Sequence, residues 1–421
     1  MNRENKIKIF EKIYSFLIIM SMVSIVFVLL AKISHNRIFL LWKEILIILS
    51  SFVLLWIRGW KFFKKELILL LCITIIVTLY SLSSPSFYIA LYQIKLDWVV
   101  LIFVIIFFFF IRRLNSVYIF NLYIYTVKLI IIFGVLNALA AIVEFWNPNF
   151  FMEIVGITPG DWGYNEGLRV ITMLDFLRSP ALLTGFVQAG SFILLSIYLT
   201  LFFPFIKGFL RLILFVVLTL GLICTTYKSG IVGLLMLMYI YITELVFSKF
   251  KSIFVNSVAI IIFVISLAGS FNEFLFRLFM NINEYIAYNS IYMRFYFTQE
   301  ILHQMDSLLK IILGVGFGYN GTFGVYKPYE AIPLDSLFLY LLSNYGVLGL
   351  VIFLGIMLYA YIKIKNESIF KGVAYYLLYL SSIEFFFNNF LVNFPVNLLV
   401  FTLLSFALIL SDRNCKEVFK L

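Results

Sequence analysis

A lysine in an apolar setting is the first residue of this sequence whose chemistry needs explaining. The segment TTYKSG, Thr225 to Gly230, separates two apolar runs and carries Lys228 among small and hydroxylated residues. A tight loop would explain the small residues. It would not explain a cation at a membrane edge with no acid beside it, since an intramembrane charge costs about 2.5–3.5 kcal/mol. A lysine close to backbone N–H groups is suited to a phosphate or diphosphate, which favours an anion site.

The polar stretch 144–179 holds further candidates. Trp162 and Tyr164 stand among turn-forming and acidic residues, a pattern typical of sugar-binding surfaces, although the same rings also suit an aromatic belt at a membrane interface. Arg169 and Arg178 precede the next apolar run. Their guanidinium groups suit bidentate capture of a phosphate or carboxylate, or else a salt bridge with an acid of the same loop.

A second polar stretch, 271–334, contains three patterns. Residues 283–311 alternate apolar and polar side chains with helical periodicity, which predicts an amphipathic helix on the membrane surface that carries Arg294. The following GVGFGYNG predicts a flexible glycine-rich segment. It has no GK[ST] ending and follows no strand, so it does not predict nucleotide binding. Asp335 then opens an apolar run, either as the N-cap of a helix, as a catalytic base, or as both.

Lys43 and Glu44 lie inside another apolar run, in LWKEIL. As sequence neighbours they point in different directions on a helix and do not form the i,i+4 type of pair. Being about one turn from the end of the run, either side chain can extend to the interface, and a functional role is the alternative.

Metal and disulfide chemistry has little support in the sequence. The three cysteines form no CxxC pair, and there are only two histidines. We therefore expect no metal site and no cofactor.

Composition decides what must position these residues. Of the 421 residues 63% are hydrophobic and only 13% are charged, and the mean hydropathy is +1.06. Typical soluble domains are roughly 45–50% apolar, so a soluble enzyme and a disordered chain are both excluded. The net charge of +11 then indicates orientation in a membrane and contact with anionic lipids, not nucleic acid.

The apolar runs predict an all-α, polytopic integral membrane protein that forms a single membrane domain over residues 1–421. A span needs about 20 apolar residues. The predicted twelve spans are 14–31, 38–57, 66–82, 92–111, 119–143, 180–206, 209–226, 229–247, 252–270, 335–361, 372–389 and 391–411. The basic leader lacks a cleavage site after it, which favours an uncleaved first helix.

Alternating loops carry unequal positive charge. With the N-terminus inside, 20 of the 32 Lys and Arg residues fall in inner segments and 10 in outer ones. This bias predicts that both termini are cytoplasmic. The two long loops, about 144–179 and 271–334, then lie on the outer face and are expected to carry the function.

The order of the motifs resembles the O-antigen polymerase and ligase family of polysaccharide-assembly membrane proteins. TTYKSG is followed by SIYMRFYFTQEIL, GVGFGYNG and PLDSLFLYLLSNYGVLGL. Family members have a small-residue turn of the "SRS" kind, an Arg-bearing segment, a "GxGxG" stretch and a His- or Asp-led span. Lys228 stands where the family usually has Arg, and Arg294 matches the loop arginine. Asp335 stands where ligases have His, with Ser336 in place of Asn, which argues against a ligase.

The resemblance implies a metal-independent, inverting glycosyltransferase. Its substrates would be oligosaccharides on undecaprenyl diphosphate at the outer face of the cytoplasmic membrane. Asp335 is the expected base, Arg294 a catalytic cation, and Lys228, Arg169 and Arg178 the further residues that hold the diphosphate. Trp162 and Tyr164 are the candidate glycan contacts. Membrane lipids, a chain-length regulator and a flippase of the same pathway are expected partners.

Other functions remain open on the sequence alone. A flippase or other transporter for lipid-linked oligosaccharides shares the span number and cationic sites, but no internal repeat is visible and the long loops lie on one face. A ligase, or a membrane glycosyltransferase using polyprenyl-phosphate sugars, are further alternatives. O-antigen, capsule and exopolysaccharide all remain as products.

Overall fold

The computed structural model describes residues 3–59, 62–155, 163–165, 168–170, 172–173, 176–247, 251–271, 293–321 and 331–413. Within these ranges the chain is helical apart from turns, extended connections and two short hairpins. The expectation of an all-α, membrane-embedded protein is confirmed.

Eight helical segments make up the first third of the chain. They are α1 (Arg3–Met22), α2 (Ile25–Ser34), the 3-10 helix η1 (Arg37–Leu41), α3 (Trp42–Arg58), α4 (Lys64–Leu82), α5 (Phe87–Ile111), α6 (Ser116–Trp146) and α7 (Pro148–Val155). Two antiparallel hairpins follow, β1 (Gly163–Asn165) with β2 (Leu168–Val170) and β3 (Thr172–Met173) with β4 (Phe176–Leu177).

The rest of the chain is again helical. It comprises α8 (Phe186–Phe202), α9 (Gly208–Cys224), α10 (Lys228–Val246), α11 (Lys251–Phe271), α14 (Met293–Gln304), α15 (Leu308–Leu313), α16 (Leu337–Ile364), η4 (Ser368–Phe370), α17 (Lys371–Tyr379), the π-helix η5 (Leu380–Glu384), α18 (Phe385–Phe387), η6 (Phe390–Val392) and α19 (Val396–Asp412).

Six described helices are long and apolar enough to cross a membrane. They are Ile38–Arg58, Lys64–Leu82, Phe87–Ile111, Ser116–Trp146, Lys228–Val246 and Leu337–Ile364. A seventh span is possible if α1 and α2, which meet at 79°, are counted together. Four shorter apolar helices lie within α8, α9, α11 and α19. Every predicted span contains helix, but several are shorter or broken.

The breaks have local causes. Helix α16 is kinked at Gly346, whose φ of 66° lies in the left-handed region that glycine adopts at low cost. The predicted span 372–389 is divided by the π-helix η5, and Asn388 is extended, so the helix ends at Phe387. The predicted span 391–411 begins its α-helix only at Val396, after η6.

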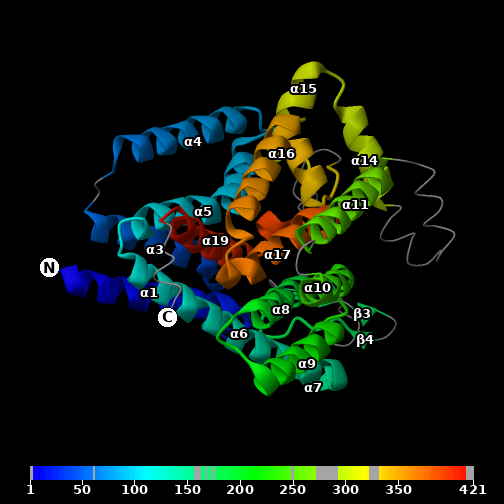
Figure 1. Cartoon of the computed structure of the whole chain (residues 1–421). Helices are drawn as coiled ribbons and strands as arrows, with labels where there is room; N and C mark the ends of the chain where they lie inside the picture. The colour runs from blue at the N-terminus through cyan, green and yellow to red at the C-terminus, as the bar shows by residue number, and fades with distance from the viewer. Residues whose placement is uncertain are drawn as a thin grey trace.

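The core lies around α8, α17 and α19, which occupy the middle of the molecule in Figure 1. Helix α8 is buried on almost all sides, and α6 packs against both α8 and α9. Helix α4 differs, because it lies apart from the body in Figure 1 and only 6% of its apolar window is buried. Such an all-round apolar surface is expected of a helix surrounded by lipid.

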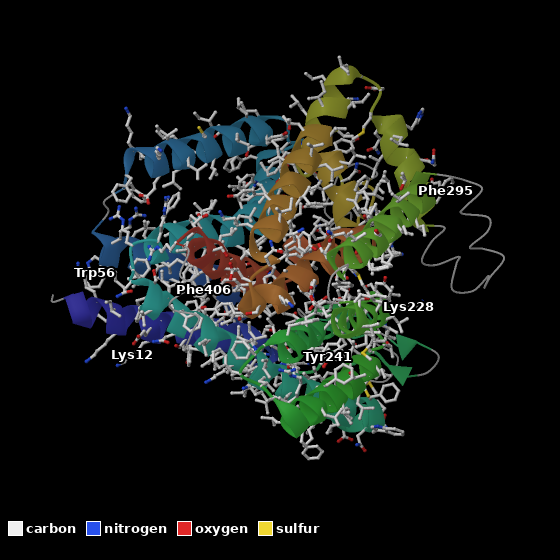
Figure 2. The ribbon with its side chains drawn as sticks, viewed as in Figure 1. Lys12, Trp56, Lys228, Tyr241, Phe295 and Phe406 are labelled. Carbon is white, nitrogen blue, oxygen red and sulfur yellow. The ribbon has the colours of Figure 1, made fainter. Side chains whose placement is uncertain are left out.

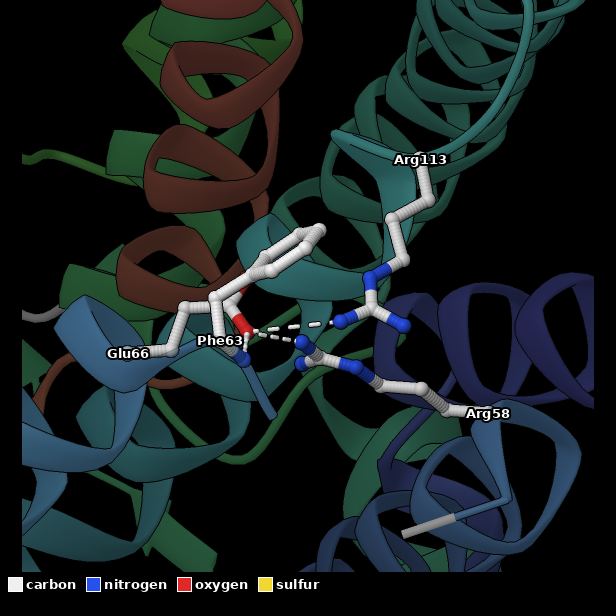
Figure 3. A network of polar contacts seen from close by, with 4 residues as sticks. All are labelled: Arg58, Phe63, Glu66 and Arg113. Atoms are coloured by element: carbon white, nitrogen blue, oxygen red, sulfur yellow. Dashed lines mark hydrogen bonds and ion pairs between the residues drawn. The ribbon is translucent and has the colours of Figure 1, made fainter. Parts of the chain in front are cut away.

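Helix α4 is held at its first residues by an ion cluster (Figure 3). Oε2 of Glu66 accepts from Arg58 and, at 2.8 Å, from the backbone N–H of Phe63, and lies 3.6 Å from Nη2 of Arg113. Arg58 ends α3, and Arg113 follows the end of α5. The buried carboxylate therefore joins three helices at one end of the bundle.

Candidate functional site

A three-residue turn between α9 and α10 places Lys228 at the first position of α10 (Figure 2). Thr226 adopts a left-handed φ of 51°, which reverses the chain. The ring of Tyr227 then packs inward against Gly190 and Gly230, where a Cβ atom would collide with it. Because Tyr227 is buried, the next side chain, Lys228, is directed outward and is exposed.

Arg178 is fastened to the same turn. It follows β4, and its Nε and Nη2 groups donate to Oγ1 and O of Thr226, both at 3.1 Å. Its guanidinium carbon lies 3.5 Å from the ring centre of Phe186, in a cation–π contact. These contacts fix the guanidinium two residues from Lys228.

Arg294 reaches the turn from α14. Its Nη2 donates to O of Phe387 at 3.0 Å, and the neighbouring Asn388 donates from Nδ2 to Oγ of Ser229 at 2.9 Å. Burial lowers the pKa of Arg294 from its ordinary value, while the nearby negative charge of Asp335 opposes that shift. Arginine remains protonated at physiological pH, so the group is a partly buried cation.

Arg178, Lys228 and Arg294 therefore form one cation cluster. Both arginines lie within electrostatic range of Lys228. Among the described residues, Lys228 makes no hydrogen bond or ion pair of its own. Three positive groups at one place suit an anion with several oxygen atoms, such as a diphosphate.

Asp335 stands beside this cluster, close enough to act on the charge of Arg294. It does not cap α16, which was one of its two predicted roles. The N-cap is Ser336, whose Oγ accepts from N of Leu339 at 3.4 Å and donates to O of Phe385 at 3.0 Å. Since Ser336 supplies the cap, the Asp335 carboxylate is left exposed, and it makes no hydrogen bond or ion pair with the described residues.

A buried polar network lies on the interior side of the turn that carries Lys228. Glu384, at the end of η5, is fully buried and accepts hydrogen bonds from the hydroxyl groups of Tyr227, of Tyr379 at 2.6 Å and of Ser191 at 3.3 Å. Asn388 donates to the Tyr227 hydroxyl oxygen at 2.9 Å. These hydrogen bonds anchor the Tyr227 hydroxyl group, and with it the turn, to η5 and Asn388.

Glu384 and Tyr227 were not among the residues predicted from the sequence. The signal for Glu384 was present, because SSIEFFFNN places one acid inside an apolar run, where a charge demands a partner. Tyr227 gave no signal of its own, since a tyrosine between two apolar runs is ordinary at a membrane interface.

The other residues predicted for the first loop cannot be compared with the cluster, because the structure does not describe their side chains. Tyr164 and Arg169 face each other in the register of β1 and β2, and their side chains lie outside the described part of the chain. Trp162 also lies outside the described residues. Their roles remain predictions.

The predicted amphipathic helix is shorter than expected. Residues 283–292 lie outside the described ranges, and the helical part divides into α14 and α15 because Ser307 caps α15, with Oγ accepting from N of Lys310. Thr298 and Ile301 are fully buried, and α14 packs against α11 and α16. Helix α14 therefore packs against the helical body of the protein and does not lie only on a membrane surface.

The prediction of a flexible GVGFGYNG segment is wrong. N of Val315 donates to O of Ser343 at 2.7 Å, and N of Gly318 donates to Oδ1 of Asn344 at 2.8 Å. Phe317 is fully buried. The segment is pinned against α16 just before its kink, so the glycines allow close backbone packing.

Comparison of the chain with protein-family models, with curated proteins and with solved structures gives no match. Within the described ranges, no three His, Cys, Asp or Glu side chains lie together in a way that could hold a metal ion. The arrangement offers an anion-binding cluster with an exposed carboxylate beside it, which is the equipment for a transfer that releases a phosphate-type leaving group.

Proposed function

We propose that this protein is a membrane glycosyltransferase of the O-antigen polymerase type. It joins oligosaccharide repeat units carried on undecaprenyl diphosphate, and the product is O-antigen, capsule or exopolysaccharide. The observation that carries the proposal is the gathering of Arg178, Lys228 and Arg294 beside Asp335, from segments 157 residues apart in the sequence at their extremes.

The proposed chemistry uses each group once. The Asp335 carboxylate accepts the proton of the acceptor hydroxyl, whose oxygen attacks the anomeric carbon of the donor with inversion. The bond from that carbon to the diphosphate breaks, and the cation cluster stabilises the charge that develops on the leaving oxygen. No metal ion is required, because the three side chains provide the positive charge.

The proposal includes a location and a topology. The twelve apolar segments cross the cytoplasmic membrane, both termini lie in the cytoplasm, and the cluster faces outward. The excess of Lys and Arg in the alternate segments assigned to the inside supports this orientation. The shorter helices would then belong to spans that include turns or neighbouring helices. A chain-length regulator and a flippase of the same pathway are the proposed partners, together with membrane lipids.

The test is the chain-length profile of the surface glycan with and without the protein. Loss of a polymerase leaves single repeat units on the surface, and re-expression restores the ladder. Single repeats trapped inside the cell would identify a flippase instead. An unlinked polymer of normal length would identify a ligase.

A further inference from the structure

A second pair of cations lies where α3 and α5 pack together. Nζ of Lys95 on α5 and Nζ of Lys43 on α3 lie 3.2 and 3.8 Å from the same oxygen of Glu44. Both lysine side chains are about one-third exposed (34% for Lys43 and 31% for Lys95), and Glu44 is 12% exposed. The group keeps a net charge of +1, because two ammonium groups share one carboxylate.

This lysine pair lies at the same end of the bundle as the cation cluster. Asn393 donates from Nδ2 to Oγ of Ser191 at 3.0 Å, and Ser191 bonds to the hydroxyl of Tyr227 in the turn. The next residue, Phe394, has its ring centre 5.9 Å from Nζ of Lys43. The segment between η6 and α19 therefore touches the cation cluster's network on one side and the lysine pair on the other.

The surroundings of the lysine pair are apolar. A shallow notch contains Lys43, Glu44 and Lys95, and its wall is formed by Ile47, Val99, Leu391 and Val392 together with neighbouring residues. The Glu44 carboxylate is held between the two ammonium groups by these close ion pairs. A basic head with an apolar wall matches a lipid that has an anionic headgroup.

We propose that Lys43 and Lys95 bind the diphosphate of a second polyprenyl-linked glycan, with its hydrocarbon tail along the apolar wall. This inference rests on the proposed function, since joining two lipid-linked units brings two anionic headgroups to one enzyme. The cation cluster holds the donor, whose diphosphate leaves. The lysine pair holds the acceptor, whose diphosphate takes no part in the bond change.

The experiment counts bound lipids on the purified full-length chain. Undecaprenyl diphosphate is titrated into the detergent-solubilised protein, and bound copies are counted by native mass spectrometry. We expect two copies on the wild type and one on the Lys43→Gln, Lys95→Gln double variant, with affinity for the second copy at least tenfold weaker. If the double variant does not fold, Lys95→Gln alone should also weaken the binding of the second copy. Lys128→Gln, at an exposed lysine within α6, is the matched control and retains two copies.

The outcomes separate the two proposals. Two tight copies on the folded double variant would overturn the second site. If the wild type binds one copy and Lys228→Gln binds none, the second site is overturned as well. The proposed function would survive that result, because the cation cluster would still bind the lipid. No copy on the wild type would refute both. Displacement of the second copy by an equal concentration of dioleoyl phosphatidic acid would make this an ordinary phospholipid site, and displacement by inorganic diphosphate would exclude a role for the tail.

Discussion

Replacing Arg294 with alanine is the most direct test of the cation cluster. The substitution removes the partly buried guanidinium group of Arg294 and leaves Arg178 and Lys228 in place. Loss of one preorganised donor to a developing charge typically costs about 2.7–4 kcal/mol in transition-state stabilisation, a factor of roughly 10²–10³ in rate. Long-chain polymer should therefore disappear while single repeat units accumulate.

The same change also has a structural cost that must be separated from the catalytic one. Nη2 of Arg294 donates to O of Phe387 at 3.0 Å. A hydrogen bond from a charged donor contributes about 1.5–3 kcal/mol to the free energy of unfolding. Arg294→Lys keeps the charge but not the planar fork, so it should recover part of the activity.

The assay is complementation of a strain that lacks the protein, with glycan ladders compared at equal amounts of protein in the membrane. Lys310→Ala is the matched control, because Lys310 lies on the neighbouring helix α15 and, within the described ranges, its ammonium group pairs with the exposed Asp306 one turn away. A normal ladder from Arg294→Ala at equal abundance would refute the assignment of Arg294. A loss equally severe in Lys310→Ala would show that the effect is not specific to the cluster.

Two further predictions concern the frame that holds the site. Gly346→Ala should lower the free energy of unfolding by at least about 2 kcal/mol, since φ is 66° and the added Cβ would meet the backbone of Ile312. The control is Gly355→Ala on the same helix, which has open space around it and should be nearly neutral. Both are measured by thermal unfolding in detergent. Glu66→Gln should lower the free energy of unfolding by about 3–5 kcal/mol, because Arg58 and Arg113 lose their shared carboxylate. The control Asp412→Asn breaks only an exposed pair with Lys363 and should leave the unfolding midpoint unchanged. Equal midpoints for Glu66→Gln and the wild type would contradict the role of that cluster.

The sequence predicted helix positions well because hydrophobicity alone determines where a chain can enter lipid. Runs such as 66–82 and 92–111 became α4 and α5 with ends shifted by a few residues. Breaks within apolar runs were not predictable in this way. Few polar residues mark these breaks: Ser24 follows the bend after Met22, and Asn388 follows the end of the helix at Phe387. Long-range backbone contacts made at both places, by Ile25 with Leu182 and by Asn388 with Leu337, cannot be read from the local sequence.

Of the candidate site, the cations were predictable and their convergence was not. Lys228 and Arg294 stood out because charge is rare in this chain. No local pattern shows that Arg178 bonds to Thr226 or that Asn388 joins the turn to the Arg294 contact, since these pairs are far apart in the sequence. Asp335 and Ser336 are both favoured N-cap residue types, so the sequence could not choose between them, and the backbone geometry selects Ser336.

The length of α9 has a consequence for the lipid around the cation cluster. Its 17 residues rise about 25 Å at 1.5 Å per residue, whereas a typical hydrocarbon core is about 30 Å thick. Its outward side chains, including Leu212, Val216 and Leu220, are about half exposed, so lipid must meet this helix directly. If α9 crosses the membrane, as the proposed topology has it, the bilayer beside so short a helix thins locally to match it. Lipid headgroups would then lie deeper at the end of α9, where the turn presents Lys228. The thinner membrane would bring the phosphate group of a lipid closer to the cation cluster.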